Sequence, residues 1–333
     1  MNGKKILLVG GCGFIGHNLA LHLKHRGHTP VIVDSLSINN IYSIDNEEIK
    51  NQKLYKSILQ NRIELLKEKD IDLIVQDARD YNSISVLYSA IKPDIIIHLA
   101  AVSHANRSNK DPHTTFDHSL RTLENTLDYA KNNRAHIIYM SSSMVYGNFD
   151  KKDVDEDVVC KPIGIYGTLK YAGELMVKAY NQVFNLPYTI IRPSALYGER
   201  CVSRRVGQIF IENAIQNLDI TVNGDGEEKL DFTYIADLVR GIGDCCETDR
   251  SINETFNITY GNARKINELL DVLKIEFPKI KVFYKEKEKF SPERGTLKTD
   301  KAKKLLNFKA KNSIEEGYLR YISWYKGFSE NKR

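Results

Sequence analysis

Short apolar runs recur through residues 1–192, and stretches with helical periodicity separate them. Apolar runs without alternating polar positions are typical of strands that are buried on both faces, as in a parallel sheet. The runs lie at Ile6–Val9, Val31–Val33, Leu73–Val75, Ile95–Ile97, Ile137–Tyr139 and Tyr188–Ile191. The helical stretches lie at Phe14–Lys24, Ser83–Ile91, Thr114–Lys131 and from Tyr166 to about Phe184. This alternation predicts an α/β fold with a doubly wound parallel sheet.

Two parts of the chain depart from this alternation of strands and helices. Beyond Arg192, short strand-like runs mix with helices and a lysine-rich tail, which predicts a smaller mixed α/β region beside the sheet. Residues 37–70 form a long polar insertion whose apolar positions have the spacing of an amphipathic helix. These positions are Ile49, Leu54, Ile58, Leu59, Ile63 and Leu66. We expect either a surface helix packed on the sheet, or a lid or oligomer contact.

The composition narrows the classes of function. The 48 basic and 43 acidic residues give a net charge of +5, and the lysines are scattered, which argues against a nucleic-acid surface. Five cysteines without CxxC spacing predict neither a zinc site nor a disulfide framework. Neither a signal-peptide pattern nor an apolar run of membrane-spanning length occurs. We therefore expect a cytoplasmic protein that uses no metal and contacts neither membrane nor nucleic acid.

A glycine-rich turn follows the first predicted strand and opens the first predicted helix. Gly10, Gly13 and Gly16 allow the backbone to approach a pyrophosphate, and the helix N-terminus behind them favours its negative charge. Asp34 ends the second strand, where a carboxylate accepts hydrogen bonds from adenosine ribose hydroxyls and repels the additional phosphate of NADP. Asp77 ends the third strand and could reach the adenine amino group. The pattern predicts a Rossmann-type site that prefers NAD to NADP.

Candidate acid–base residues follow later in the chain. Tyr166 and Lys170 are four residues apart and therefore share one face of a helix. The lysine charge favours the phenolate, which can take a proton from a substrate hydroxyl. The serines of Ser141–Ser143 end the fifth strand, at the edge of the sheet where ligands bind. One of their hydroxyls can donate a hydrogen bond to the same substrate oxygen.

With these motifs the chain resembles the extended short-chain dehydrogenase/reductases, in the branch of NAD-dependent nucleotide-sugar epimerases and dehydratases that includes UDP-glucose 4-epimerase. The resemblance covers nearly the whole length. Its motifs are Gly10–Gly16, Asp77–Asp80, His98–Ala101, Ser141–Gly147, Tyr166–Lys170, Arg192–Gly198 and Asp231–Asp237. It implies that Ser142 is the catalytic serine and that Leu99 to Ala101 line the nicotinamide. The predicted cofactor site further includes Phe14, Ile15, Ser35, Ala78, Leu99, Ala100 and Ala101, and Tyr166 and Lys170 also belong to it.

The resemblance implies oxidation of a sugar carbon, usually C4, to a ketone, followed by return of the hydride. Dehydratases of the family carry Asp-Glu after the catalytic hydroxyl, decarboxylases keep the Glu, and 3,5-epimerases use a Cys there. This chain has Ser143 and Met144, and because a methionine neither gives nor takes a proton, we expect 4-epimerisation. A 4-dehydrogenase or 4-keto reductase is the alternative. A 4,6-dehydratase, suggested by the setting of His104, and a non-catalytic NAD-binding sensor are further alternatives.

The resemblance also implies a nucleotide-diphosphate sugar as substrate. Where the family often has an arginine for the nucleotide phosphate, this chain has Leu230, so we expect Arg204, Arg205 or Arg294 to bind it, unless these are surface arginines. The predicted substrate-binding residues are Ser103, His104, Ser142, Ser143, Arg205 and Arg294. We expect an NAD-binding domain over residues 1–192, to which 231–259 return, and a substrate-binding region over 193–230 and 260–333.

A homodimer is the expected assembly. The helical stretches Thr114–Lys131 and Tyr166–Phe184 resemble the two helices that pair across the family's dimer. Their apolar residues fill either such a seam or the ordinary core. These residues are Leu120, Leu123, Leu127, Leu175 and Met176.

Overall fold

The computed structural model describes residues 3–44, 49–149, 152–286 and 292–330. Its seven-stranded sheet has the order β12-β7-β5-β4-β1-β2-β3, and all neighbouring strands are parallel. The strands are β1 (Lys5–Val9), β2 (Thr29–Asp34), β3 (Asp72–Val75), β4 (Ile95–His98), β5 (His136–Met140), β7 (Tyr188–Arg192) and β12 (Glu254–Asn257). The six predicted strands are confirmed. The seventh, β12, returns from the C-terminal half of the chain to pair with β7.

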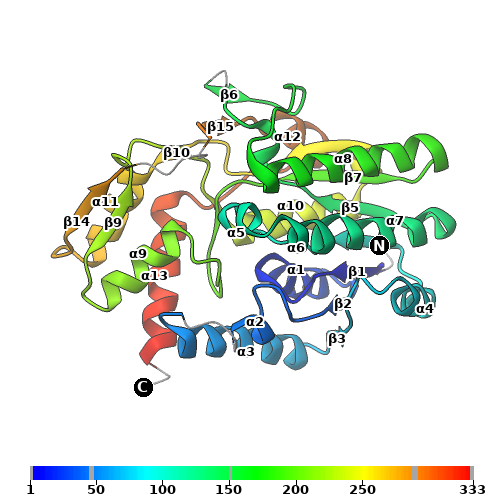
Figure 1. Cartoon of the computed structure of the whole chain (residues 1–333), viewed down its shortest axis with the longest axis horizontal. Coiled ribbons are helices and arrows are strands. Elements are labelled where there is room, and N and C mark those ends of the chain that lie inside the picture. The colour runs from blue at the N-terminus through cyan, green and yellow to red at the C-terminus, as the bar shows by residue number, and fades with distance from the viewer. Residues whose placement is uncertain (1–2, 45–48, 150–151, 287–291, 331–333) are drawn as a thin grey trace.

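Helices cover both faces of the sheet (Figure 1) because alternate residues of each strand point to opposite sides. Ile6 and Leu8 of β1 belong to one core, whereas Leu7 and Val9 belong to the other. The first face carries α1 (Phe14–His25), α10 (Ile235–Glu247) and α12 (Asp300–Leu306), and the second carries α4 (Tyr81–Ile91), α7 (Thr122–Asn133) and α8 (Gly164–Phe184). The doubly wound fold that the sequence predicted is confirmed.

The helical stretch predicted over Thr114–Lys131 is divided in the structure. It follows α5 (Ala105–Lys110), begins as α6 (Pro112–Phe116), passes through a π-helical turn, η1 (Asp117–Arg121), and continues as α7. A π-helical turn interrupts the regular side-chain spacing of an α-helix, so periodicity alone did not show it.

The apolar residues expected at a dimer seam separate into two groups. Leu120, Leu123 and Leu127 are buried in the core between the helices and the sheet, so for these three the ordinary core is the correct one of the two predicted alternatives. Met176 is partly buried against the same core. Leu175 on α8 is 51 % exposed and is the one residue of this set that α8 presents on the surface of the protomer.

The smaller mixed region that the sequence predicted lies at one end of the sheet (Figure 1). It consists of β8 (Leu196–Tyr197), α9 (Val206–Ile215), β9 (Ile220–Asn223), β10 (Lys229–Leu230), β11 (Thr233–Tyr234), β13 (Arg264–Lys265), α11 (Ile266–Glu276), β14 (Val282–Lys285) and α13 (Ile314–Glu330). Tyr318, Tyr321 and Tyr325 of α13 are fully buried in its core. Among the described helices, none has both the length and the apolar character of a membrane span.

The 37–70 insertion forms α2 (Ile41–Ile44) and the longer α3 (Gln52–Glu68). Ile58 and Leu59 of α3 are buried in the core of the smaller region, whereas Leu66 is buried in the core of the sheet. The helix α3 therefore packs on both the sheet and the smaller region, whereas the first of the two alternatives had predicted a helix packed on the sheet alone.

Candidate active site

A cavity of about 630 Å³ is lined both by the carboxyl ends of the sheet strands and by the smaller region. Every residue predicted for the cofactor, the substrate or the chemistry lies on its wall. The cofactor set is Gly10, Gly13, Phe14, Ile15, Gly16, Asp34, Ser35, Asp77, Ala78, Leu99, Ala100 and Ala101. The catalytic and substrate set is Ser103, His104, Ser142, Ser143, Tyr166, Lys170, Arg205 and Arg294. This edge of a doubly wound sheet is where ligands bind.

The glycine loop between β1 and α1 is shaped to receive an anion. Gly10 has φ +75°, and a Cβ at this position would lie 2.6 Å from the backbone nitrogen of Ala100. Gly13 is the N-cap of α1, and a Cβ there would meet only the Gly10 carbonyl oxygen, at 3.5 Å. The loop therefore faces open cavity, and the first turn of α1 offers its N–H groups there. These residues fit the pyrophosphate of a dinucleotide.

The Asp34 carboxylate is fixed at the end of β2. It accepts hydrogen bonds from the backbone N–H groups of Cys12 at 2.9 Å and Leu36 at 2.7 Å. Burial raises the pKa of Asp34, while these two hydrogen bonds and the charge of Arg62 oppose the rise. Each carboxylate oxygen keeps a further lone pair that can accept a ribose hydroxyl.

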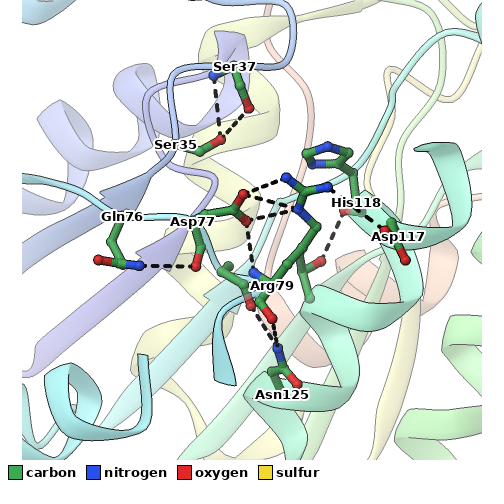
Figure 2. Close-up of polar contacts among 10 residues, drawn as sticks. Ser35, Ser37, Gln76, Asp77, Arg79, Asp117, His118 and Asn125 are labelled. Carbon is green, nitrogen blue, oxygen red and sulfur yellow. Dashed lines mark hydrogen bonds and ion pairs between the residues drawn. The ribbon is translucent and has the colours of Figure 1, made fainter. Parts of the chain in front are cut away.

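Figure 2 shows Asp77 facing the guanidinium group of Arg79. Arg79 donates from Nη2 to Oδ2 at 2.6 Å and from Nε to both carboxylate oxygens at 3.1 Å. Burial alone would raise the pKa of Asp77, but the hydrogen bonds from Arg79 outweigh it and lower the pKa. Asn125 of α7 steadies the same turn by donating to the carbonyl oxygens of Ala78 and Arg79. The contact between Asp77 and adenine stays a prediction, with Arg79 holding the carboxylate in place.

The serines that follow β5 have different surroundings. Ser141 donates its hydroxyl hydrogen bond to Glu174 Oε1 at 2.5 Å. Ser142 Oγ instead accepts a hydrogen bond from the backbone N–H of Met144, at 3.2 Å, where the short 3₁₀ turn η2 (Ser143–Tyr146) begins. The O–H of Ser142 thus stays available to a ligand in the cavity, which supports its assignment over Ser141.

Tyr166 and Lys170 lie one turn apart on α8. Lys170 Nζ donates a hydrogen bond to the Met140 carbonyl oxygen at 2.7 Å, at the end of β5. Burial lowers the pKa of Lys170 to about 8, and the charge of Glu174 opposes this fall. Tyr166 is half-buried and lines the cavity. A cation that is buried next to the half-buried tyrosine suits proton transfer to and from the phenol.

Glu174 is a site residue that the sequence analysis missed. Both of its oxygens accept hydrogen bonds from the Arg192 guanidinium, at 2.9 and 2.7 Å, and this ion pair is almost fully buried. Arg192 also donates to the hydroxyl oxygen of Tyr146 at 2.9 Å. The available signal was the spacing of Tyr166, Lys170 and Glu174, which places all three on one helix face.

Two arginines line the same cavity. Burial lowers the pKa of Arg294 to about 10, and the charge of Arg205 adds to this effect, while Glu228, 3.8 Å away, opposes it. In the part of the chain that the structure describes, Arg294 Nε has no hydrogen-bond partner. Arg205 Nη2 donates to the Ser103 carbonyl oxygen at 2.5 Å. Two guanidinium groups against the one carboxylate of Glu228 keep a net positive charge, which suits them to bind a diphosphate. No cluster of metal-ligating side chains occurs among the described residues.

Known proteins share both the sequence and the architecture. The model of the NAD dependent epimerase/dehydratase family matches residues 6–259. The chain is 28 % identical over 328 residues to a putative UDP-glucose 4-epimerase from Methanocaldococcus jannaschii, with 96 % of this chain and 98 % of the relative covered. The solved UDP-glucuronic acid 4-epimerase from Bacillus cereus, in complex with UDP-glucuronic acid and NAD, has a TM-score of 0.87 at 25 % identity, covering 97 % and 99 % of the two chains. The UDP-glucose 4-epimerase from Thermotoga maritima, solved with UDP-glucose, has a TM-score of 0.84 at 25 % identity and the same coverage. Since the family model covers most of the chain, this protein belongs to the NAD dependent epimerase/dehydratase family.

Proposed function

We propose that this protein is an NAD-dependent 4-epimerase of a nucleotide-diphosphate sugar, with a uridine diphosphate sugar as the first candidate. The observation that carries the proposal is that one cavity joins the glycine loop, the catalytic set and the arginine pair described above. The uridine nucleotide is supported by the relatives, because the Bacillus cereus and Thermotoga maritima enzymes hold UDP-glucuronic acid and UDP-glucose in the same fold.

Different residues of the cavity have different roles in the proposed reaction. Gly10, Gly13 and Gly16 would hold NAD at the glycine loop, and the bound cofactor would supply hydride acceptance and return at C4 of the sugar. Tyr166 takes the proton of the C4 hydroxyl and gives it back later, while the buried charge of Lys170 stabilises the phenolate. Ser142 donates a hydrogen bond to the same oxygen. Arg205 and Arg294 hold the diphosphate, so the sugar can present its opposite face to the returning hydride without leaving the site.

The residues beside Ser142 favour epimerisation over dehydration. Loss of water across C5 and C6 requires a base for the C5 proton and an acid for the leaving hydroxyl. Ser143 and Met144 line the cavity at the positions where dehydratases of the family carry Asp-Glu, and neither residue performs these tasks near neutral pH. These two positions therefore offer the 4-ketone no carboxylate to eliminate water, and the ketone is reduced again.

The organisation of the molecule forms a further part of the proposal. Residues 1–192 and 231–259 form the NAD-binding domain, and 193–230 and 260–333 form the substrate region. The return of β12 to the sheet supports this division, and two elements depart from it: α12 packs on the sheet, and β11 pairs with β8 of the smaller region. The protein is a homodimer, which the exposed Phe116 and Leu175 on α6 and α8 support. It works in the cytoplasm, and five free thiols suit that reducing compartment.

Incubation of the purified protein with UDP-, GDP-, CDP- and dTDP-sugars, followed by NMR analysis of the products, tests the proposal. We expect a UDP-sugar to be converted to its C4 epimer, with no accumulation of the absorbance of NADH. Stoichiometric NADH accumulation would instead identify a 4-dehydrogenase, and the absence of turnover with all four nucleotide classes would contradict the proposal altogether.

A further inference from the structure

Residues Gly198–Arg205, which we call the arginine loop, bring Arg204 and Arg205 to the cavity. The backbone of this loop is strained, because Arg200 has φ +62° and Arg204 has φ +53°, values that favour glycine. A non-glycine residue keeps such a conformation only where its surroundings hold it. The shape of the loop therefore depends on the contacts that surround it.

One of these contacts comes from Arg62 on α3, in the second half of the 37–70 insertion. The side chain of Arg62 is 1 % exposed, and its Nε and Nη2 both donate to the Arg200 carbonyl oxygen, at 3.1 and 2.5 Å. A planar guanidinium group with two converging donors fixes both the place and the direction of that carbonyl group. The first half of the arginine loop is thereby attached to α3.

A second contact reaches the other half of the loop through two intermediate side chains. The hydroxyl of Tyr55, also on α3, donates to Glu212 Oε2 at 2.7 Å. Gln208 Nε2 donates to Glu212 Oε1 at 2.8 Å, and Gln208 Oε1 accepts from the backbone N–H groups of Ser203 and Arg204 at 2.8 and 2.9 Å. Tyr55 is buried away from the cavity wall. The Tyr55 hydroxyl thus lies outside the cavity, but it acts through Glu212 and Gln208 on the backbone amide of Arg204, which lines the cavity.

A third contact joins the arginine loop to the glycine loop. His17 Nδ1 lies 2.9 Å from the Gly13 carbonyl oxygen, and Arg200 Nε donates to His17 Nε2 at 3.3 Å. Burial and the charge of Arg62 hold the pKa of His17 well below its usual range, so the ring is neutral. The carbonyl oxygen can only accept, so Nδ1 carries the proton and Nε2 is the acceptor. The substrate loop and the cofactor loop therefore share one hydrogen-bond network.

We propose that α3 is a substrate-positioning element that holds the arginine loop, through Arg62 and Tyr55, in the conformation that binds the diphosphate of the sugar nucleotide. This role rests on the proposed function, because it assigns the diphosphate to the arginine loop. Tyr55 touches neither the reacting sugar nor the cofactor site. The effect of its hydroxyl falls on nucleotide affinity and KM, and kcat is spared.

Tyr55→Phe tests the proposal because it removes a single hydroxyl group. In the NAD-loaded protein we expect the Kd of UDP, measured by calorimetry, and the KM of the sugar nucleotide to rise about tenfold, as fits a lost hydrogen bond to a charged group. We expect kcat to stay within about twofold of the wild-type value. Arg62→Lys keeps the charge but loses the two-donor geometry and should act in the same direction. Combining Tyr55→Phe with Gln208→Leu should raise KM less than additively, since both lie on one route.

Tyr129→Phe is the matched control. It removes another buried tyrosine hydroxyl, which donates to the Tyr88 carbonyl oxygen at 2.9 Å in the core of the sheet, and it should leave the Kd of UDP unchanged. If wild-type protein binds no nucleoside diphosphate, the proposed function itself is wrong. If the wild type binds UDP and Tyr55→Phe binds it equally well, the positioning role is wrong. Should Tyr55→Phe not fold, Arg62→Lys decides the question, measured on NAD-loaded protein because Arg62 itself lines the cavity and its charge acts on Asp34.

Discussion

At the scale of single residues, the Glu174 carboxylate organises the catalytic edge of the sheet. It accepts hydrogen bonds from Ser141 and from the Arg192 guanidinium, and it lies one helical turn beyond Lys170. A buried ion pair of this kind is tolerated because each partner makes several hydrogen bonds. As a consequence, the hydroxyl of Ser141 donates its hydrogen bond to Glu174, and the hydroxyl of Ser142 remains available to the substrate.

Tyr166→Phe should lower kcat/KM by about 100- to 10,000-fold, the usual contribution of a positioned acid–base group. The NAD content and the melting temperature should match those of the wild type, because only a hydroxyl at the cavity wall is lost. NMR progress curves and the absorbance of NAD released on denaturation measure the two effects. Tyr180→Phe, on the same helix but outside the cavity wall, serves as the control. A Tyr166→Phe variant with wild-type turnover would remove Tyr166 from the mechanism.

The pH dependence of the reaction should report on Lys170. Its pKa is lowered to about 8 by burial, so the cation that supports the phenolate is present below pH 8 and is lost as the pH rises through that value. We expect kcat/KM to fall on the alkaline side with a midpoint near pH 8. The charge of Glu174 raises the pKa of Lys170, so Glu174→Gln should move this midpoint to lower pH. Melting curves at pH 7 and pH 9 separate this shift from unfolding, and an unmoved midpoint in a folded variant would contradict the assignment.

At the scale of elements, α8 carries site residues on one face and, in the proposed dimer, would pair with its copy through another. One face carries Tyr166, Lys170 and Glu174 toward the cavity and the core, and the other leaves Leu175 half exposed. An apolar side chain on the surface of a long helix suits the helix pairing of a symmetric dimer, because the same patch meets its own copy across the twofold axis.

Leu175→Glu should therefore shift the protein from dimer to monomer, since the symmetric contact would bring two like charges together. Light scattering at micromolar concentration measures the change. Val86→Glu, at an apolar position on α4 that is 73 % exposed, is the matched control and should stay dimeric. A wild-type protein that is monomeric at this concentration would rule the dimer out.

At the scale of the whole molecule, the products of the closed reaction cycle should keep the mass of the substrate. In the proposed reaction the 4-ketone would lie in the cavity that Ser143 and Met144 line, and these two residues supply no elimination chemistry. Mass spectrometry of each converted sugar nucleotide should show no change, whereas net oxidation removes two hydrogens. A product lighter by one water would identify a dehydratase and would make His104, which lines the same cavity, the next residue to substitute.

Local patterns by themselves determined much of this protein. Six apolar runs predicted six strands of the sheet, and the glycine loop with Asp34 predicted the NAD site, because residues a few positions apart specify a strand, a turn or a helix start. The spacing of Tyr166 and Lys170 likewise predicted their shared helix face, and both line the cavity.

Only the tertiary structure decided which distant side chains meet. Helical periodicity shows that one face of α3 is buried but not what buries it, and the partner of Arg62 lies 138 residues further along the chain, that of Tyr55 157 residues. The same limit applies to Leu123, since an apolar spacing serves a core or a dimer seam equally well until packing decides between them. Propensity and spacing act between neighbours along the chain, whereas the contacts that hold the arginine loop form only once the chain has folded back on itself.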